Sequence, residues 1–526
     1  MIHVRRFPLP LLLLLFALLS HEAPAREFVS HGPGGAASTG HERATQAALD
    51  LLDKGGNAVD AAVAAAFMLA VVEPSNSGLG GDGFAILRLP AKGLEAWDAS
   101  SPLPPGAATG SSDIGLPTEP AFLLHLHDRH GSRSRAEVLA PAIRVAAEGF
   151  PVSAYLARRI EERLPRLRDP LARRVFAPTG RPPAPGERLV QPALARTLRL
   201  LASRGLPGLS QGLAGGILAG DLRARGSFYP ISDITNFRPR FVRPAVLRIG
   251  RYTLAGPPPP SSAVVVMAGL KAVFDLERRQ GGRASPEQRI RIIERLFFLM
   301  SSLLPASIGS PARFLIEAER SLAAIGTRPE PPAPDSAEMP GETTHLVTWD
   351  RTGMIVSMTL TLGTHFGTGD FCPLGFFYNN ETANRKNPAF RYPPTYPADA
   401  GPVSTKSPLL VFDRHRPVCA IGGAGAGRIV SNLFLILDAL LHGDRSLPDA
   451  VHAPRIHIQR SGGLQVEQPP VPSALPGSRR ISLLPAGADL FGLVSAVGVA
   501  SQGLVAVGDT RRDGAAGTLP EPSPRR

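Results

Sequence analysis

Two threonine-rich runs on either side of a short glycine-containing segment constrain the fold of this 526-residue chain more than any other feature. Residues 344–349 and 354–362 are rich in β-branched side chains, which favour strands. Residues 351–353 between them indicate a tight turn. The pattern therefore predicts an antiparallel hairpin, in which Thr343 and Thr361 lie close together across the ladder.

The position of Thr343 at the start of the first predicted strand suggests a specific chemistry. If the peptide bond between Glu342 and Thr343 is cut, Thr343 becomes a new N-terminus that carries a hydroxyl nucleophile and an α-amino base on one residue. The pKa of an unperturbed α-amino group is about 7.7–8.0, so this group accepts a proton near neutral pH. Threonine pairs are also common in ordinary sheets, and the hairpin alone leaves both interpretations open.

The region around Thr343 resembles the self-cleavage site of the γ-glutamyltranspeptidase family, whose members cut themselves before the first threonine of a Thr-Thr-His run. Four further segments resemble family motifs and follow the family order along the chain. They are residues 55–62 (GGNAVDAA), 73–84 (EPSNSGLGGDGF), 258–262 (PPPSS) and 422–429 (GGAGAGRI). Each motif is weak alone, but together they cover nearly all of the chain after its N-terminal leader.

Helical and strand patterns on both sides of residues 327–342 predict a layered α/β fold. The resemblance sharpens this to the four-layer αββα sandwich of N-terminal-nucleophile hydrolases. Helices are expected at 42–54, 58–71, 134–147, 153–164, 191–203, 212–224, 262–278, 286–303 and 429–441, and further strands at 84–89, 246–254, 376–378, 409–412 and 418–421.

Residues 327–342 form the clearest linker, with five prolines and no apolar periodicity. A plain interdomain linker would have the same composition, but the adjoining Thr343 favours a self-cleavage site. We therefore expect a large fragment of residues 26–342 and a small fragment of residues 343–526. The two would stay together as a heterodimer within one αββα unit.

The resemblance implies a role for four residues in acyl transfer from an amide. Thr343 would attack the carbonyl carbon, and Thr361 would hydrogen-bond the nucleophile and orient it. The backbone N–H groups of Gly425 and Ala426 would stabilise the oxyanion. Water or an amine would then accept the acyl group, and no cofactor or metal is expected.

Substrate recognition is where the sequence departs from the family, whose members hold the γ-glutamyl group by its α-amino and α-carboxylate groups. Ser100 stands where an arginine is expected for the carboxylate, and Asn384 stands where an aspartate contacts the amino group. Glu381 replaces a glutamine and Gly363 an asparagine. The substrate-binding residues implied by the resemblance are Gly363, Glu381, Asn384, Ser404 and Thr405. The loss of a charge-assisted bond of about 1.5–3 kcal/mol predicts weaker binding of a free γ-glutamyl group.

Three functions are compatible with these motifs. The first is hydrolysis or transfer of a γ-glutamyl or similar acyl group from an amide such as glutathione. The second is an acylase for dicarboxylic-acid amides, which the uncharged Asn384 favours. The third is a non-catalytic family member that acts as a binding protein. His345 and His365 are candidate bases, but we expect structural roles for both because the α-amino group already fills that function.

The N-terminus has the features of a signal peptide, residues 1–25. Arg5 and Arg6 precede the apolar run 9–19, and residues 23–25 form an A-x-A cleavage site. We therefore expect an exported protein, periplasmic or secreted; an uncleaved anchor is the alternative. No later segment has 18 consecutive apolar residues, so no stable membrane insertion is expected.

The net charge of +13 is spread along the chain, and aromatic residues make up only 6% of it. Nucleic-acid binding calls for a concentrated basic patch with interleaved aromatics, so this composition argues against a nucleic-acid partner and fits a small anionic substrate better. Cys372 and Cys419 do not lie in a metal-ligand spacing, and the sequence leaves open whether they pair.

Overall fold

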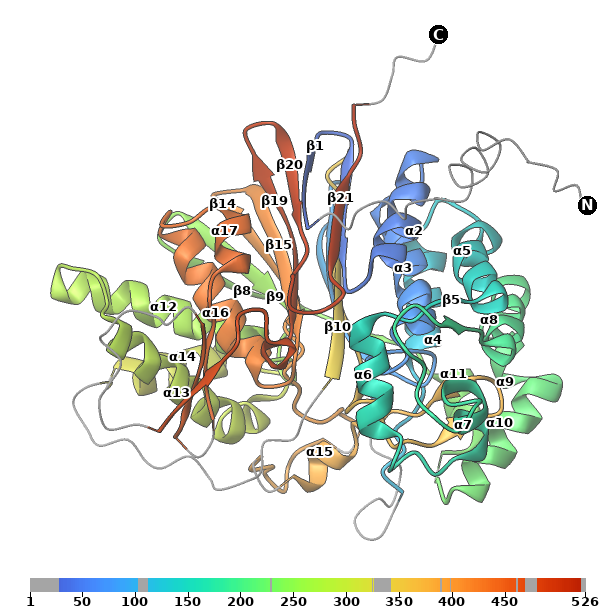
Figure 1. Cartoon of the computed structure of the whole chain (residues 1–526). Coiled ribbons are helices and arrows are strands. Elements are labelled where there is room, and N and C mark those ends of the chain that lie inside the picture. Colours follow the sequence, from blue (N-terminus) through green and yellow to red (C-terminus); the bar gives the residue numbers. More distant parts are fainter. Residues whose placement is uncertain are drawn as a thin grey trace, which may run out of the picture.

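The computed structural model is built around two large β-sheets that face each other (Figure 1). The described residues are 28–102, 112–227, 229–323, 325, 342–387, 390–397, 399–459, 462–468 and 480–521. The predicted signal peptide, nearly all of the proline-rich segment and residues 522–526 lie outside them.

The first sheet has seven strands in the spatial order β21-β2-β10-β11-β3-β4-β7. Their bounds are Ala515–Thr518 (β21), Gly35–Thr39 (β2), Glu342–Asp350 (β10), Ile355–Gly363 (β11), Asp82–Leu89 (β3), Gly93–Asp98 (β4) and Arg240–Val242 (β7). Strands β10 and β11 are the predicted hairpin, and their register pairs Thr343 with Thr361. The structure therefore confirms the hairpin and places it in the middle of this sheet.

The second sheet also has seven strands, in the order β1-β20-β19-β15-β14-β9-β8. Their bounds are Val29–Gly32 (β1), Gly503–Val507 (β20), Leu493–Ala500 (β19), Arg416–Ala424 (β15), Leu409–Asp413 (β14), Tyr252–Gly256 (β9) and Ala245–Ile249 (β8). The prediction of a single strand over residues 246–254 is wrong. Gly250 adopts a φ of +59° there, and the chain reverses to form the β8–β9 hairpin.

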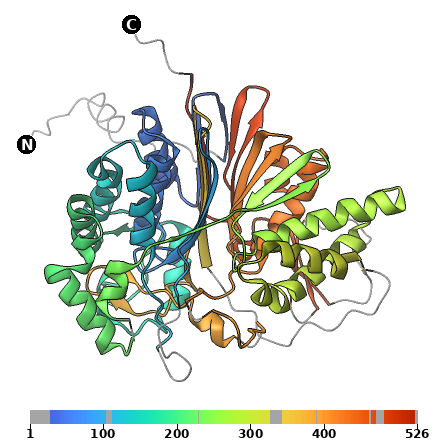
Figure 2. The same ribbon diagram turned by 180° about the vertical axis from the view of Figure 1, so that it is seen from behind.

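Helices cover the outer face of each sheet and complete four layers (Figures 1 and 2). On the first sheet lie α2 (Glu42–Asp53), α3 (Ala58–Val72), α4 (Glu119–His130), α5 (Arg135–Glu148) and α8 (Pro192–Arg204). On the second lie α12 (Ala263–Gln280), α13 (Pro286–Ser302), α14 (Pro311–Ala323), α16 (Arg428–Leu441) and α17 (Leu447–His452). Buried apolar residues form three clusters, one between the sheets and one beneath each helical layer. This architecture confirms the αββα prediction.

Shorter elements extend the helical side of the first sheet and the ends of both sheets. The helices are α6 (Ala154–Arg163), α7 (Pro170–Phe176), α9 (Pro207–Ser210), α10 (Gly212–Ala224), α11 (Ile231–Asn236) and α15 (Ala383–Lys386). The strands are β5 (Phe150–Pro151), β6 (Arg188–Leu189), β12 (Phe371–Cys372), β13 (Phe376–Phe377), β16 (Ile456–Ile458), β17 (Leu464–Glu467) and β18 (Ile481–Leu484). All nine predicted helices are present with ends within two residues of the prediction. The sequence did not predict the helices α4, α7, α9, α11, α14, α15 and α17.

The alternation of side chains along β10 decides where Thr343 points. Leu346 belongs to the core between the first sheet and its helices, whereas Val347 belongs to the core between the two sheets. Side chains alternate faces along a strand, so Thr343 lies on the same face as Val347. The candidate nucleophile therefore points towards the second sheet.

Cys372 lies in β12 and Cys419 in β15, and both are free and buried. The structure thus answers the question that the sequence left open, because the two residues do not pair. None of the helices in the described ranges has the length and apolarity needed to cross a bilayer.

Candidate active site

A cavity opens where β10 begins and β11 ends, and most of the residues singled out from the sequence line it. These are Thr343, Thr361, Gly363, Glu381, Asn384, Ser404, Thr405 and Ala426. They come from two strands of the first sheet and from three other segments that are distant in sequence, one of which includes the short helix α15. Gly425 is not among the lining residues, whereas its neighbour Gly427 is.

Thr343 and Thr361 meet at an irregularity in the β10–β11 ladder. Glu342 pairs with Gly363 and Thr343 with Thr361, so the register shifts by one residue between Glu342 and Thr343. Such bulges are frequent beside active sites because they redirect a side chain. The Thr361 hydroxyl donates a hydrogen bond to the Glu342 carbonyl and accepts one from the Gly363 amide at 2.8 Å. Thr361 thus contacts the carbonyl of the expected cleavage site.

The Thr343 hydroxyl itself makes no hydrogen bond to any residue that the structure describes. The side chain is 4% exposed, and it borders the cavity rather than packed core. Its oxygen is therefore available to a molecule in the cavity.

Residues 425–427 form a loop between β15 and α16, and two of them, Ala426 and Gly427, line the cavity. Ala426 has a φ of +53°, in the left-handed region that a residue with a side chain seldom adopts. Within the described part of the chain, the N–H groups of Gly425, Ala426 and Gly427 have no acceptor. They precede the N-terminus of a 14-residue helix, whose dipole favours negative charge. This loop is suited to bind a developing oxyanion.

The side chain of Glu342 is held by two residues that the sequence analysis did not connect with it. Arg512 Nη1 lies 2.6 Å from one carboxylate oxygen, and His365 Nε2 lies 2.8 Å from the other. Burial would raise the pKa of Glu342, but the charges and hydrogen bonds of Arg512 and His365 outweigh it and lower the pKa to about 2. Glu342 is therefore an ionised, fixed residue on the acyl side of the expected cleavage site.

A second buried carboxyl group, that of Glu73, lies behind β10. Thr344 donates a hydrogen bond of 2.7 Å to Glu73. Burial raises the pKa of Glu73 to about 7, and the Thr344 hydrogen bond only partly offsets this. Glu73 belongs to the motif at residues 73–84, so this part of the motif supports the strand that carries Thr343.

His345 connects the two sheets. Its ring is fully buried, and Nδ1 lies 2.8 Å from the Thr359 hydroxyl. Burial lowers the pKa of His345 to about 3, so the ring is neutral. A Cβ added at Gly422 would lie 2.2 Å from the ring, which explains why the glycine-rich strand β15 has no side chain there. His345 therefore has a packing role, as the sequence analysis expected.

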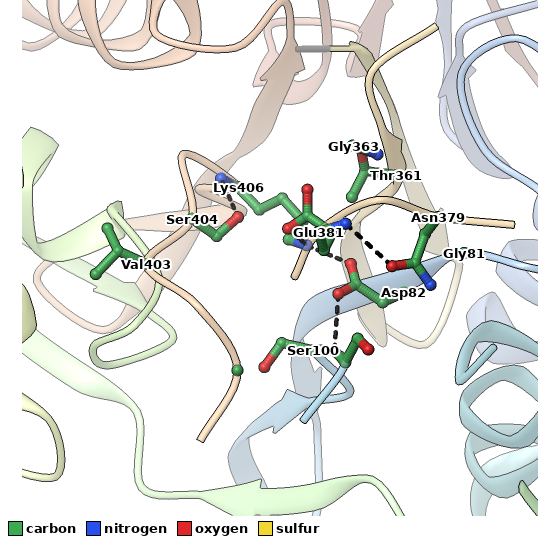
Figure 3. Close-up of polar contacts among 12 residues, drawn as sticks. Gly81, Asp82, Ser100, Thr361, Gly363, Asn379, Glu381, Val403, Ser404 and Lys406 are labelled. Atoms are coloured by element: carbon green, nitrogen blue, oxygen red, sulfur yellow. Dashed lines mark hydrogen bonds and ion pairs between the residues drawn. The ribbon is translucent and has the colours of Figure 1, made fainter. Parts of the chain in front are cut away.

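Lys406 is the main site residue that the sequence analysis missed. Its side chain is 1% exposed, and its ammonium contacts the carboxylates of Asp82 and Glu381, the latter at 3.0 Å (Figure 3). Burial would lower the pKa of Lys406, but these two carboxylates raise it above its ordinary value, so the ammonium remains charged. Lys406 directly follows Ser404 and Thr405, and this adjacency was the one available indication in the sequence.

The Pro-Ser motif at residues 258–262 supports the segment that carries Lys406. The Ser261 and Ser262 hydroxyls donate to the carbonyls of Lys406 and Ser404, each at 2.8 Å. The glycines of the 77–84 turn have a different role. A Cβ at Gly80 would lie 1.9 Å from a backbone oxygen, so close packing accounts for it, and Gly80 does not line the cavity.

Ser100, aligned with the family arginine, does not line the cavity either. Its amide donates to Asp98 at 2.8 Å, and Asp98 in turn pairs with Arg240. The position of the missing arginine is therefore occupied by a serine that hydrogen-bonds Asp98 at the end of β4.

The family model described as gamma-glutamyltranspeptidase matches residues 44–519. The chain belongs to the gamma-glutamyltranspeptidase family. This family member is 27% identical over 497 residues to the glutathione hydrolase proenzyme of Bacillus subtilis (strain 168), covering 84% of this chain and 83% of that protein. It is 29% identical over 478 residues to the acylase ACY 1 proenzyme of Pseudomonas sp. (strain V22), covering 83% and 84%.

Among solved structures, the cephalosporin acylase from Bacillus halodurans matches this family member with a TM-score of 0.80 at 23% identity. The match covers 95% of this chain and 99% of that one, and it identifies the fold as that of N-terminal-nucleophile hydrolases. Membership of the family identifies the enzyme class. Because the relatives are named for different activities, it does not identify the substrate, which has to be inferred from the site.

Proposed function

We propose that this chain is an exported, self-processing threonine-nucleophile enzyme that hydrolyses or transfers a γ-glutamyl or similar acyl group from an amide such as glutathione. The observation that carries the proposal is the position of Thr343. Its hydroxyl borders a cavity that Thr361, Ala426 and Gly427 also line. Among the residues that the structure describes, neither this hydroxyl nor the amides of residues 425–427 have a hydrogen-bond partner. Nucleophile, orienting hydroxyl and oxyanion donors are the parts that acyl transfer needs.

Self-cleavage begins at the Glu342 carbonyl. The hydrogen bond from Thr361 polarises this carbonyl, and Arg512 and His365 hold the Glu342 side chain. The Thr343 oxygen attacks the carbonyl carbon, the C–N bond breaks, and the nitrogen takes up the hydroxyl proton. Water then hydrolyses the resulting ester. This step releases Glu342 as a new C-terminus with a free α-carboxylate and leaves Thr343 with a free α-amino group.

The same oxygen then serves in turnover. The freed α-amino group accepts the Thr343 hydroxyl proton as the oxygen attacks the substrate amide, and the amides of residues 425–427 stabilise the oxyanion. The leaving amine takes the proton, and the acyl group stays on Thr343 as an ester. Water or an acceptor amine attacks this ester and regenerates the enzyme.

The sheet topology suits a heterodimer of residues 26–342 and 343–526. Strand β10 of the small fragment pairs with β2 of the large one, and β11 pairs with β3. A cut between Glu342 and Thr343 leaves these ladders intact, so the two fragments remain one folded unit.

The experiment is purification of the chain and of its Thr343→Ala variant, followed by intact mass and N-terminal sequencing. The unsubstituted chain is expected as two fragments, the smaller beginning at Thr343, while the variant stays whole. The N-terminus of the larger fragment tests export, with residue 26 expected. Release of chromophore from γ-glutamyl and glutaryl anilides then reports activity. A chain that stays uncut and releases neither chromophore contradicts the proposal.

The uncharged Asn384 favours a second candidate, an acylase for dicarboxylic-acid amides. In that case the glutaryl anilide is cleaved with the higher kcat/KM, and the γ-glutamyl anilide is the poor substrate.

A further inference from the structure

The buried charged groups beside the cavity include more carboxyl groups than ammonium groups. Two carboxyl groups, those of Asp82 and Glu381, face the single ammonium of Lys406 (Figure 3). All three side chains are at least 95% buried. The positive charge of Lys406 is therefore fully compensated, and the cavity offers no net positive charge to a bare carboxylate.

Each of the two groups facing the cavity has binding capacity left. An ammonium has three N–H donors, and two of those on Lys406 point to Asp82 and Glu381. Glu381 uses one carboxylate oxygen for Lys406, and the other has no hydrogen bond to any described residue. Among the described residues, one N–H donor of Lys406 and one oxygen of the adjoining Glu381 carboxylate therefore have no hydrogen-bond partner, and the Lys406 ammonium lies 5.5 Å from the centre of the Phe84 ring.

Neighbouring residues hold the backbone of Glu381 in place and leave its carboxylate accessible. Asn379 accepts a hydrogen bond from the Glu381 amide at 3.2 Å and donates to the Gly80 carbonyl at 2.7 Å. A Cβ at Gly363 would lie 3.2 Å from the free oxygen of Glu381 and 2.1 Å from Asn380. Gly363 therefore leaves open the space in front of Glu381.

The two charges correspond to those that this chain lacks at the expected positions. The carboxylate missing at Asn384 is present three residues earlier, at Glu381. The cation missing at Ser100 is supplied by Lys406, and the two places are linked because Asp82 contacts Lys406 and also accepts the Ser101 amide at 2.8 Å. The charged groups therefore stand at other positions than in the family, but the site still contains one ammonium, that of Lys406, and one available carboxylate, that of Glu381.

We propose that Lys406 and Glu381 determine the acyl specificity of this enzyme, with Lys406 binding the carboxylate and Glu381 the ammonium of an α-amino-acid end group. The inference rests on the proposed function and narrows its substrate class to zwitterionic acyl groups such as γ-glutamyl. A glutaryl group brings a carboxylate without the ammonium, and it meets the uncompensated carboxylate of Glu381. This conclusion reverses the sequence-based expectation that the uncharged Asn384 favours an acyl group without an amino charge.

The test measures binding by calorimetry to the purified chain with three matched ligands. L-Glutamate carries both charges, glutarate lacks the ammonium, and 4-aminobutyrate lacks the α-carboxylate. Binding needs no turnover, so the result stands even if the chain has no amidase activity, and the anilide assay reports that failure separately. L-Glutamate is expected to bind at least about tenfold more tightly than either of the others, as one charge-assisted bond requires.

Two substitutions should separate the roles of the pair. Lys406→Met should weaken L-glutamate about 10- to 100-fold and change 4-aminobutyrate less than about threefold. Glu381→Gln should weaken L-glutamate and 4-aminobutyrate by a similar factor and leave glutarate unchanged or tighter. Lys92→Met, at an exposed turn between β3 and β4, is the control and should change none of them.

Because Lys406→Met leaves Asp82 buried without its partner, the double variant Lys406→Met/Asp82→Asn is measured as well, with folding checked by circular dichroism. It should show the same selective loss of L-glutamate. Equal weakening of all three ligands in the folded double variant, or tighter binding of glutarate than of L-glutamate by the unsubstituted chain, would overturn the proposal.

Discussion

Replacing Arg512 by methionine should destabilise the uncut chain and slow its self-cleavage, because it removes one of the two partners of the buried Glu342 carboxylate. Arg512 Nη1 lies 2.6 Å from this carboxylate, and His365 contacts the other oxygen. The pKa of Glu342 is lowered from 4.5 to about 2, a difference worth about 3 kcal/mol. Loss of the arginine is therefore expected to cost about 2–4 kcal/mol of unfolding free energy at pH 7.

Urea denaturation of chains that also carry Thr343→Ala measures this cost on a single uncut species. Arg512 has other contacts, among them the ring of Tyr155 at 5.2 Å, so a cycle with Glu342→Gln and the double variant isolates the pair. We expect a coupling energy of about 1.5 kcal/mol or more at pH 7. A coupling below about 0.5 kcal/mol would refute the reasoning, since exposed pairs already reach that value.

The coupling should also depend on pH with a defined sign. The folded-state pKa of Glu342 lies below the unfolded one, so its contribution is fully present above about pH 4.5 and is lost as the pH falls towards 2. The matched control is Arg251→Met, which removes an exposed partner of Asp413 and should not change stability measurably.

Three further predictions concern the same region. Thr361→Val removes the donor to the Glu342 carbonyl and should slow self-cleavage about 10²–10³-fold, measured as fragment appearance on gels, while unfolding free energy changes little. Gly422→Ala places a methyl 2.2 Å from the His345 ring and should cost about 1–3 kcal/mol in urea denaturation; Gly216→Ala, in the open middle of α10, should be neutral or stabilising. The pKa of Glu73 is raised in the folded chain, so we expect the unfolding free energy to fall as the pH rises from about 4.5 through 7 and Glu73 loses its proton. Glu73→Gln should remove this dependence on pH. A melting temperature with the same pH slope in both chains would contradict this last prediction.

The hairpin that carries Thr343 and Thr361 could be predicted because its signals are local. Strand propensity, the alternation of side chains and the turn glycine all lie within about twenty residues, and the register follows from them. The helix ends were equally local, as the capping box of Asn57 and Asp60 at the start of α3 illustrates. Such features need no knowledge of the tertiary fold.

The contacts of the site could not be predicted in the same way, because they join residues far apart in the chain. Arg512 is 170 residues from Glu342, and Lys406 is 324 residues from Asp82. Neither arginines nor lysines have a periodicity that indicates their partners, and one arginine among 57 basic residues does not stand out. The β8–β9 hairpin failed for the opposite reason: its turn, Gly250–Arg251, is too short to interrupt the strand pattern visibly.

The two halves of the proposed site depend on different parts of the structure, and this has a kinetic consequence. The reacting half is positioned by backbone: the register of β10 and β11, the bulge beside Thr343 and the left-handed turn at Ala426. The recognition half is made of side chains, Lys406 and Glu381, that come from separate loops and meet only through their charges. Changes to the second half should therefore alter KM and the choice of acyl group while self-cleavage proceeds at its ordinary rate, because cleavage uses no group of that pair. Changes that disturb the β10–β11 register should abolish self-cleavage and turnover together, because both reactions use the same oxygen and the same amides.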